Sequence, residues 1–467
     1  MSIYYAQGTS VAARLAARIV ALSYRDLPEQ ARHWARIGIV DTVGVTLAGA
    51  SEPCARIAGA VSLPSQGSSL LFGRTERVRA TDAALINGTA AHALDFDDCS
   101  NTLGGHPSAP VLPALFALAD ASPVNGRDFM TAYVVGFETL TRIARAVNFH
   151  HYDKGWHPSA TLGVFGACAA SARLMELDAA RTATALSIAA SFSSGLKANF
   201  GTMTKPLHIG HAARNGLMAA LLAREGYTAG DAAFEHKQGF FNVFNGVGNF
   251  DAEAPLRDWA DPLDIVEPGI AIKQYPCCGS THPAIDAMLM LAYEHDLRAE
   301  QVERVVSRTH PRRLQHTNRP EPASALDAKF SVQYCVACAL ARRRVVLSDF
   351  EGDAWADPAI RALMTRVTAE PDSLADQQPD HFGAEIVVYL RDGRQLAKRV
   401  AKAAGRTSAN PLPISRIESK FIDCASHALS TEASAQVYEL LWRIDELDDI
   451  ADISAALEQG AVQRNII

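Results

Sequence analysis

The chain has 467 residues, and its 44 Lys and Arg against 51 Asp and Glu give a net charge of −7. Hydrophobic residues make up 48% and charged residues 20%, values typical of a globular protein with a sizeable core. This composition excludes an intrinsically disordered chain. It also argues against nucleic acid as a partner, because there is no basic excess to neutralise a phosphate backbone.

The same sequence indicates a cytoplasmic protein without a membrane partner. The segment MSIYYAQGTS lacks the basic and apolar regions of a signal peptide, and no run of 18 apolar residues could form a membrane span. Eight scattered cysteines do not suggest a disulfide framework. Cys335 and Cys338 lie in the run KFSVQYCVACALARRR, which predicts a buried helix with both thiols in the core rather than at a metal or redox site.

Residues 1–261 are predicted to form the first part of a helical domain. Apolar residues recur at i, i+3, i+4 and i+7 in five segments, which are SVAARLAARIVALSY, PEQARHWARIGIVDTVGVTLAG, TDAALINGTAAHALDF, RDFMTAYVVGFETLTRIARAV and AARNGLMAALLAREG. No repeated strand pattern separates them. Neither G-x-G-x-x-G after a strand nor G-x-x-x-x-G-K-[ST] occurs, so nucleotide binding has no support.

Residues 262–405 are predicted to form a smaller α+β domain. QVERVVSRTH and AEIVVYL are rich in β-branched residues, and Asp392-Gly393 after the second of them indicates a hairpin. The helical pattern returns in residues 406–467, which we expect to pack back on the helical domain. The predicted fold class is therefore mainly α, with a large all-helical domain and a smaller α+β domain.

Four of the fifteen histidines are followed by proline: His106, His157, His282 and His310. Proline favours the first position of a helix, so the preceding histidine is expected at the N-cap. The positive end of the helix dipole disfavours imidazolium there, which predicts a neutral base at pH 7. The first two histidines share the tetrapeptide H-P-S-A, although the helix after His106 could begin later. The alternative is that these histidines merely cap helices at surface turns.

A second group of candidates lies in GLKANFGTMTKPLHIGHAARNG. Lys205 precedes a proline at a predicted helix start, where a lysine and the helix N-terminus together suit an anion. His208 and His211 are three residues apart and share one helical face, a spacing that also suits a metal ion or simple packing.

Acidic residues and one further lysine complete the candidates. LDFDDCS places Asp95, Asp97 and Asp98 together, where they could bind Mg²⁺, raise one another's pKa, orient a base, or be solvated acids at a helix end. Lys273 precedes a glycine-bearing loop in IKQYPCCGSTHPAID, a position that suits a carboxylate ligand or a solvated lysine.

These residue types together suggest an enzyme that acts on a polycarboxylate. Lysines suit several carboxylates, and neutral histidines suit removal of a proton α to a carboxylate, with cations stabilising the enolate-like intermediate. Two alternatives remain. One is a metal-dependent lyase or hydrolase that uses Asp95, Asp97, His208 and His211. The other is a non-catalytic carboxylate-binding protein.

The segments ALDFDD, HPSAPVLPAL, KGWHPSAT, TKPLHIGHAARNG and KQYPCCGSTHPAIDA resemble the MmgE/PrpD family over residues 8–450 or so. That family includes 2-methylcitrate dehydratase, cis-aconitate decarboxylase and iminodisuccinate epimerase. The resemblance implies a helical domain plus an α+β lid domain, a homodimer, and no metal or organic cofactor. The lid motif looks closest to epimerase-like members.

The resemblance also implies roles for individual residues. His106 and His157 would transfer protons, Asp95 would orient one of them, and Lys205 and Lys273 would bind carboxylates. We also assign substrate binding to His208, His282 and Arg319. Two departures bear on the reaction: Cys99 replaces a threonine of some members, and His316 is nearest to the place of a tyrosine that the decarboxylase uses. The sequence leaves epimerisation, dehydration and decarboxylation open.

Overall fold

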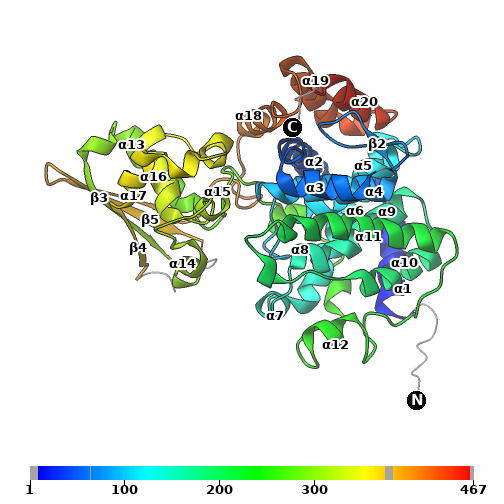
Figure 1. Cartoon of the computed structure of the whole chain (residues 1–467). Helices are drawn as coiled ribbons and strands as arrows, with labels where there is room; N and C mark the ends of the chain where they lie inside the picture. The colour runs from blue at the N-terminus through cyan, green and yellow to red at the C-terminus, as the bar shows by residue number, and fades with distance from the viewer. Residues whose placement is uncertain (1–8, 64, 374–381, 463–467) are drawn as a thin grey trace. The chain divides into compact units, whose positions relative to one another are not determined.

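The computed structural model describes residues 9–63, 65–373 and 382–462 (Figure 1). The first eight residues, on which the absence of a signal peptide was judged, lie outside this part. The chain divides into two compact units. The helical unit comprises Met1–Ile272 with Thr407–Ile467, and the mixed unit comprises Lys273–Arg406. The domain boundaries inferred from the sequence, at 261/262 and 405/406, stay predictions.

Helices of very different length build the helical unit (Figure 1). The long ones before residue 272 are α1 (Val11–Ala21), α2 (Glu29–Gly49), α3 (Pro53–Ser62), α4 (Ala80–Ala93), α5 (Ser108–Ala119), α6 (Gly126–Val147), α9 (Gly163–Leu174), α10 (Ala179–Phe192) and α11 (Thr204–Arg224). The short ones are α7 (His150–Asp153), α8 (Pro158–Thr161) and α12 (Phe240–Asn245). The chain returns in α18 (Ile414–Ala425), α19 (Thr431–Trp442) and α20 (Ala451–Gly460), and β1 (Ser69–Leu70) pairs with β2 (Arg77–Val78).

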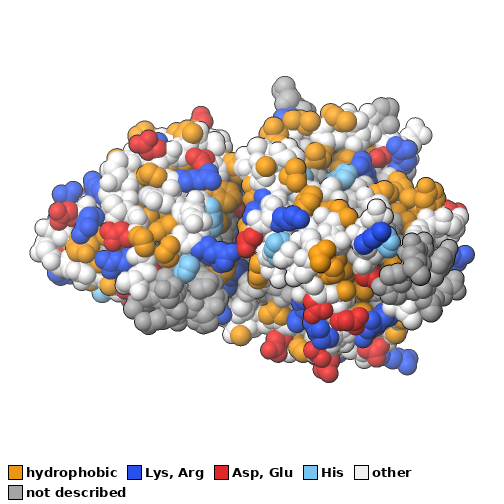
Figure 2. All heavy atoms as spheres, turned by 90° about the horizontal axis from the view of Figure 1, so that it is seen from below, with side chains coloured by type: hydrophobic (Ala, Val, Ile, Leu, Met, Phe, Trp, Pro, Cys, Tyr) orange, Lys and Arg blue, Asp and Glu red, His pale blue; other side chains and the backbone are white. Residues whose placement is uncertain are grey.

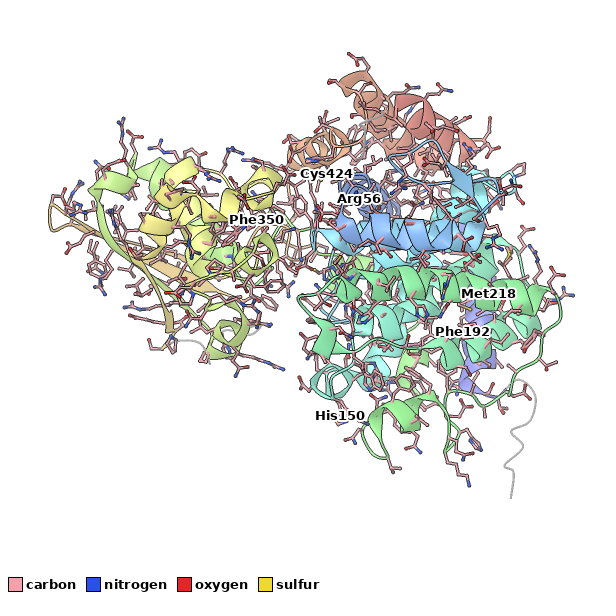
Figure 3. All side chains as sticks on the ribbon, viewed as in Figure 1. Arg56, His150, Phe192, Met218, Phe350 and Cys424 are labelled. Carbon is pink, nitrogen blue, oxygen red and sulfur yellow. The ribbon has the colours of Figure 1, made fainter. Side chains whose placement is uncertain are left out.

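Small residues allow the central helices to approach closely. A Cβ on Gly88 of α4 would lie 2.8 Å from the Cα of Gly210 of α11, and one on Gly210 would lie 2.1 Å from the Leu85 carbonyl oxygen. On α2, Gly44 faces Phe421 and Cys424 of α18, and Figure 3 labels the second of these. The α4–α11 contact matters for function, because it brings the end of α4 beside the start of α11.

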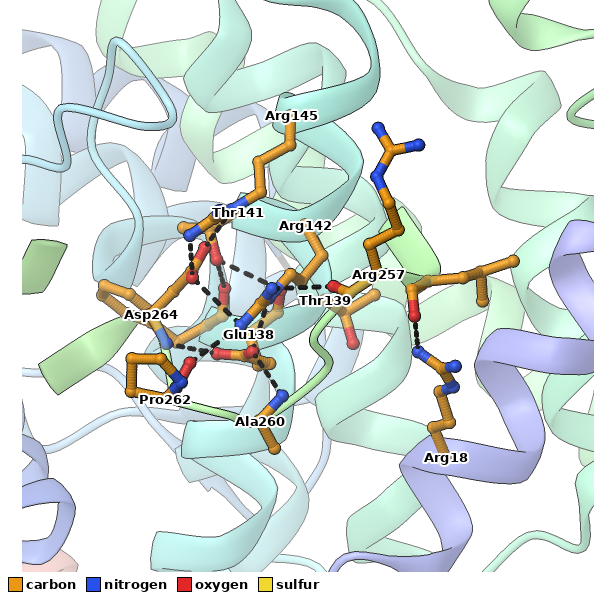
Figure 4. A network of polar contacts seen from close by, with 12 residues as sticks. Arg18, Glu138, Thr139, Thr141, Arg142, Arg145, Arg257, Ala260, Pro262 and Asp264 are labelled. Atoms are coloured by element: carbon orange, nitrogen blue, oxygen red, sulfur yellow. Dashed lines mark hydrogen bonds and ion pairs between the residues drawn. The ribbon is translucent and has the colours of Figure 1, made fainter. Parts of the chain in front are cut away.

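A buried ionic network fixes the segment after α12 against α6 (Figure 4). Arg142 donates to Glu138 Oε1 at 2.7 Å and to the carbonyl oxygens of Arg257 and Pro262. Glu138 also accepts from the Asp264 backbone N–H at 2.7 Å. Burial, followed by the nearby Asp264 carboxylate, raises the pKa of Glu138 to about 7. We assign the network a structural role, because its charged side chains pair with one another and with nearby backbone groups.

The mixed unit is built around a four-stranded sheet of order β4-β3-β5-β6. Its strands are β3 (Val302–Thr309), β4 (Val367–Pro371), β5 (Ala384–Leu390) and β6 (Gln395–Val400), and its helices are α13 (His282–Glu294), α14 (Pro311–Thr317), α15 (Ala325–Ala328), α16 (Val332–Arg342) and α17 (Pro358–Met364). β3 and β4 are parallel, and the other neighbours are antiparallel. The hairpin at Asp392-Gly393 is confirmed, with Gly393 at φ 87°. The sequence did not predict β4, which is short and largely unburied.

The thiols behave as the sequence predicted. All eight cysteines are free, and Cys335 and Cys338 on α16 are fully buried in the core of the mixed unit. On the face shown in Figure 2, acidic and basic side chains are interspersed. In the described part of the chain, no helix combines the length and the apolar character that crossing a membrane requires.

Candidate active site

Polar side chains from three segments gather in the helical unit where α4 ends. Ligand-type atoms of His92, Asp95, Asp97 and His106 all lie within 4.8 Å of one another, and all four residues are buried. Lys205, at the start of α11, places Nζ 2.9 Å from Asp95 Oδ1. The cluster therefore brings together four residues proposed from the sequence, Asp95, Asp97, His106 and Lys205, and adds His92 to them.

The loop between α4 and α5 is fixed by backbone contacts. Asp95 adopts φ 54°, a left-handed conformation that aspartate tolerates better than most residues, and it turns the chain out of α4. Cys99 pairs with Ala271 as an isolated antiparallel bridge. The backbone N–H of His106 donates to Ser159 Oγ at 2.9 Å. The loop is thereby tied to the second H-P-S-A segment.

One carboxylate, that of Asp97, joins two imidazoles. Its oxygens lie 2.9 and 3.0 Å from His92 Nδ1, and Oδ2 lies 3.1 Å from His106 Nδ1. Burial, the largest single effect, would lower the pKa of His106, but Asp97 and Cys99 together outweigh it and raise the pKa to about 10. Burial would raise the pKa of Asp97, and the two histidines reverse this and hold it below its usual range. At pH 7 His106 is an imidazolium paired with a carboxylate.

The expectation of a neutral, N-capping His106 is wrong. Helix α5 begins at Ser108, and its N-cap is Pro107, so His106 lies ahead of the helix end. The hydroxyl of Ser108 instead binds Asp98 and lies 2.6 Å from the Tyr133 hydroxyl. The charge of His106 follows from Asp97, a partner that the proline rule does not consider.

His157 has the opposite character. It is the N-cap of α8, as predicted, and only 2% of it is exposed. Its Nδ1 lies 3.2 Å from His208 Nδ1, so one imidazole donates and the other accepts. Burial, followed by nearby cations and histidines such as His92 and Lys205, places the pKa of His157 well below 6.5. His157 is therefore neutral at pH 7, chiefly because it is buried rather than because of the short helix α8.

The metal site proposed as an alternative is not assembled. His208 faces His157, and His211 contacts Ser194 and Asn215, so neither joins Asp95 and Asp97. This predicted ligand set is wrong because α11 presents Lys205, not its histidines, to the acids. The four residues that are close together have the composition of a possible metal site, but their charges are already balanced in this structure. Their carboxylates already face Lys205 and the protonated His106, which supply the positive charge a metal would bring.

Three proposed binding residues lie in the mixed unit. Lys273 is 6% exposed. His282 is the first residue of α13 and Thr281 is its N-cap, so the predicted capping position of His282 is off by one. His282 packs against Tyr275, with ring centroids 5.1 Å apart, and Arg319 pairs with Asp327. The substrate-binding roles of Lys273, His282 and Arg319 stay predictions.

Sequence reasoning missed His92 because no proline follows it. A usable signal existed, since His92 precedes Asp97 by five residues at the end of a helical pattern. Sequence reasoning considered Asp97 as a metal ligand, as a neighbour that shifts the pKa of the other acids, as a group that orients a base or as a solvated acid, but not as the partner of two histidines. Cys99 was noted only as a departure, and its Sγ lies 3.9 Å from His106 Nδ1.

Comparisons with known proteins agree with this architecture. The MmgE/PrpD N-terminal domain model matches residues 13–253, and the MmgE/PrpD C-terminal domain model matches residues 275–445. A cis-aconitate decarboxylase from Homo sapiens is 30% identical over 90% of this chain and 89% of its own length. The Mus musculus protein of the same name is 29% identical over 85% and 83%. One from Aspergillus terreus is 27% identical over 92% of both chains.

Proposed function

The chain belongs to the MmgE/PrpD family, and from this premise we propose that it is a lyase that acts on a di- or tricarboxylate by removing a proton α to a carboxylate. The observation that carries the proposal is the unequal protonation of two neighbouring histidines. His157 is a buried neutral base, while His106 is an imidazolium that can serve as an acid.

Different residues of the cluster can carry out proton removal and stabilisation of the resulting charge. His157 takes the proton from carbon, which leaves an enolate-like charge on the substrate carboxylate. Lys205 and His106 offer positive charge for that intermediate, and this kind of electrostatic stabilisation is often the largest contribution to catalysis. Asp95 holds the ammonium of Lys205 at 2.9 Å and lies 3.5 Å from His106 Nε2, so it orients both cations. We further propose that Lys273 binds a carboxylate and that no metal or organic cofactor takes part.

Dehydration and epimerisation start from the carbanion that proton removal leaves, whereas decarboxylation forms an enolate-like carbanion by breaking the carbon–carbon bond to CO₂ and then needs a proton from an acid such as His106. Decarboxylation is the first to test, because several relatives of this chain carry the name cis-aconitate decarboxylase. Dehydration would use His106 to protonate a leaving hydroxyl. Epimerisation would return a proton to the opposite face. Cys99 and His316 stand where the resemblance leads us to expect threonine and tyrosine. Because of these two differences, experiment must decide among decarboxylation, dehydration and epimerisation.

The test is incubation of the purified protein in D₂O with cis-aconitate and a panel of other di- and tricarboxylates. We expect release of CO₂, release of water or deuterium uptake at an α carbon with at least one compound. Chelator-treated protein should react at the same rate. The His157→Gln variant is the matched control and should form product at least about 100-fold more slowly. Absence of all three events across the panel would contradict the proposed function, and loss of activity with the chelator would revive a metal-dependent mechanism.

We also propose a cytoplasmic homodimer. The eight free cysteines support a reducing compartment, and the resemblance to the family supports the dimer. Light scattering at micromolar concentration should give about twice the mass of the 50.1 kDa chain. A monomer under these conditions would contradict the dimer.

A further inference from the structure

His92 is a buried histidine at the C-terminal end of α4 that the proposed chemistry has not yet used. Its side chain is fully buried. The ring lies close to both proposed catalytic histidines, with centroid distances of 4.4 Å to the charged His106 and 5.9 Å to the neutral His157. Asp97 and Lys205 are the charged groups that act on it besides His106. A residue in this place can affect either histidine.

The proton on His92 is assigned by its partners. Burial, only partly opposed by Asp97, lowers its pKa to about 4, so the ring is neutral at pH 7. Nδ1 faces both oxygens of the Asp97 carboxylate and must donate, which leaves Nε2 as a bare acceptor. Nε2 is buried, and it has no hydrogen-bond partner in the described part of the chain. A buried acceptor without a donor is unfavourable, so a donor that reaches Nε2 would be stabilised there.

The nearest group that gains a proton in the proposed reaction is His157. Its ring already makes a nitrogen–nitrogen contact of 3.2 Å with His208 at a centroid distance of 5.4 Å. The distance between the ring centroids of His92 and His157 is 5.9 Å, only slightly longer than the 5.4 Å between the ring centroids of His157 and His208. The two rings are therefore close enough to share a nitrogen–nitrogen hydrogen bond once an N–H of His157 faces His92 Nε2.

We propose that His92 is a positioning residue that accepts a hydrogen bond from His157 once His157 carries the substrate proton. The C–H bond of the substrate breaks, its electrons stay on the carbanion, and the new N–H of His157 then turns to His92 Nε2. Asp97 holds His92 in the required tautomer through Nδ1. Because the interaction exists only after proton transfer has begun, it stabilises the transition state rather than the bound substrate. This inference rests on the proposed function.

Two conservative variants separate the two nitrogens of His92. His92→Asn keeps an amide N–H near the Nδ1 position for Asp97 but removes the Nε2 acceptor. His92→Gln places an amide oxygen near the Nε2 position and loses the donor to Asp97. If the acceptor is what matters, His92→Asn should lower kcat about 10–150-fold, the cost of a hydrogen bond to a charged group, with KM little changed. His92→Gln should retain more activity than His92→Asn.

A pH profile distinguishes this role from simple structural support. Without the acceptor the charged form of His157 is less stable, so the acidic limb of kcat should move to lower pH in His92→Asn and stay in place in His92→Gln. His151→Gln is a matched control, because His151 is also buried and neutral but both its nitrogens already bind Asn245 and Thr161. It should lower thermal stability without moving the limb.

Nitrogen-15 NMR of the wild-type protein gives a readout independent of activity. A protonated Nδ1 and a bare Nε2 on His92 are expected near pH 7, and the reverse tautomer would overturn the inference even if neither variant folds. Wild-type kcat in His92→Asn would also overturn it and leave the proposed function intact. A wild-type protein that turns over no compound in the panel would instead contradict the proposed function itself.

Discussion

The two H-P-S-A segments have identical sequences and opposite electrostatics. His106, in the first, faces a buried carboxylate and is charged at pH 7, whereas His157, in the second, faces another imidazole and is neutral. Even the serines differ: Ser108 binds Asp98, while Ser159 accepts a hydrogen bond from the backbone of His106. A shared tetrapeptide therefore does not imply a shared chemical state, because buried partners from other helices determine the charge of an imidazole.

The largest effects should come from removing either imidazole. His157→Gln and His106→Gln should each lower kcat by about 10²–10⁴-fold, the usual worth of general acid–base catalysis, while the protein stays folded. Steady-state kinetics with the substrate found in the panel, together with circular dichroism, measure this. A variant that keeps more than about a third of wild-type kcat would show that its histidine is structural.

A more selective substitution should make the histidine of the first H-P-S-A segment, His106, less charged and so more like His157 in the second. Asp97→Asn removes the carboxylate beside His106 Nδ1, so the pKa of His106 should fall below about 10, because burial then meets less opposition. The alkaline limb of the kcat profile should move down with it. NMR titration of His106 measures the shift. Asp98→Asn is the matched control: the Asp98 carboxyl group bonds to Ser108 and not to a histidine, so His106 should keep its pKa.

Asp97→Asn should also lower the stability of the folded protein. Losing one partner of a buried ion pair costs about 3–5 kcal/mol. The folded pKa of His106 is raised, so its contribution is full below 6.5 and is lost as pH rises to about 10. The folded pKa of Asp97 is lowered, so its contribution is present above 3.8 and is lost as pH falls. The difference in melting temperature between the wild-type protein and Asp97→Asn should therefore be largest between pH 3.8 and 6.5. A difference that does not change with pH would contradict the assigned charges.

The smallest effect should come from the partner of His157. His208→Gln removes a neutral hydrogen bond worth about 0.5–1.5 kcal/mol, which corresponds to a loss of about 2–12-fold in kcat. His211→Gln, one helical turn further along α11 and without a contact to His157, should leave kcat unchanged. Equal losses in both variants would indicate a general effect on α11 rather than a specific contact with His157.

Much of the fold was accessible to sequence patterns. Helical periodicity predicted α1, α2, α4, α6 and α11, and Asp392-Gly393 predicted the β5–β6 hairpin, because these signals depend on local spacing. Strand β4 was missed, since five largely unburied residues carry no clear alternation and pair with β3 only through the tertiary fold.

The candidate site shows the same division more sharply. The sequence by itself singled out most candidate residues, because the H-P-S-A repeats, the acidic D-F-D-D run and the T-K-P-L-H segment are visible as motifs, but it did not single out His92. Only the tertiary structure decided which of them meet. The close approach of α4 and α11 at Gly88 and Gly210 delivers Lys205 to Asp95, and the turn at Asp95 sets Asp97 between His92 and His106. The protonation state of a side chain depends on its burial and on its charged neighbours. The spacing of residues along the chain predicts neither of these.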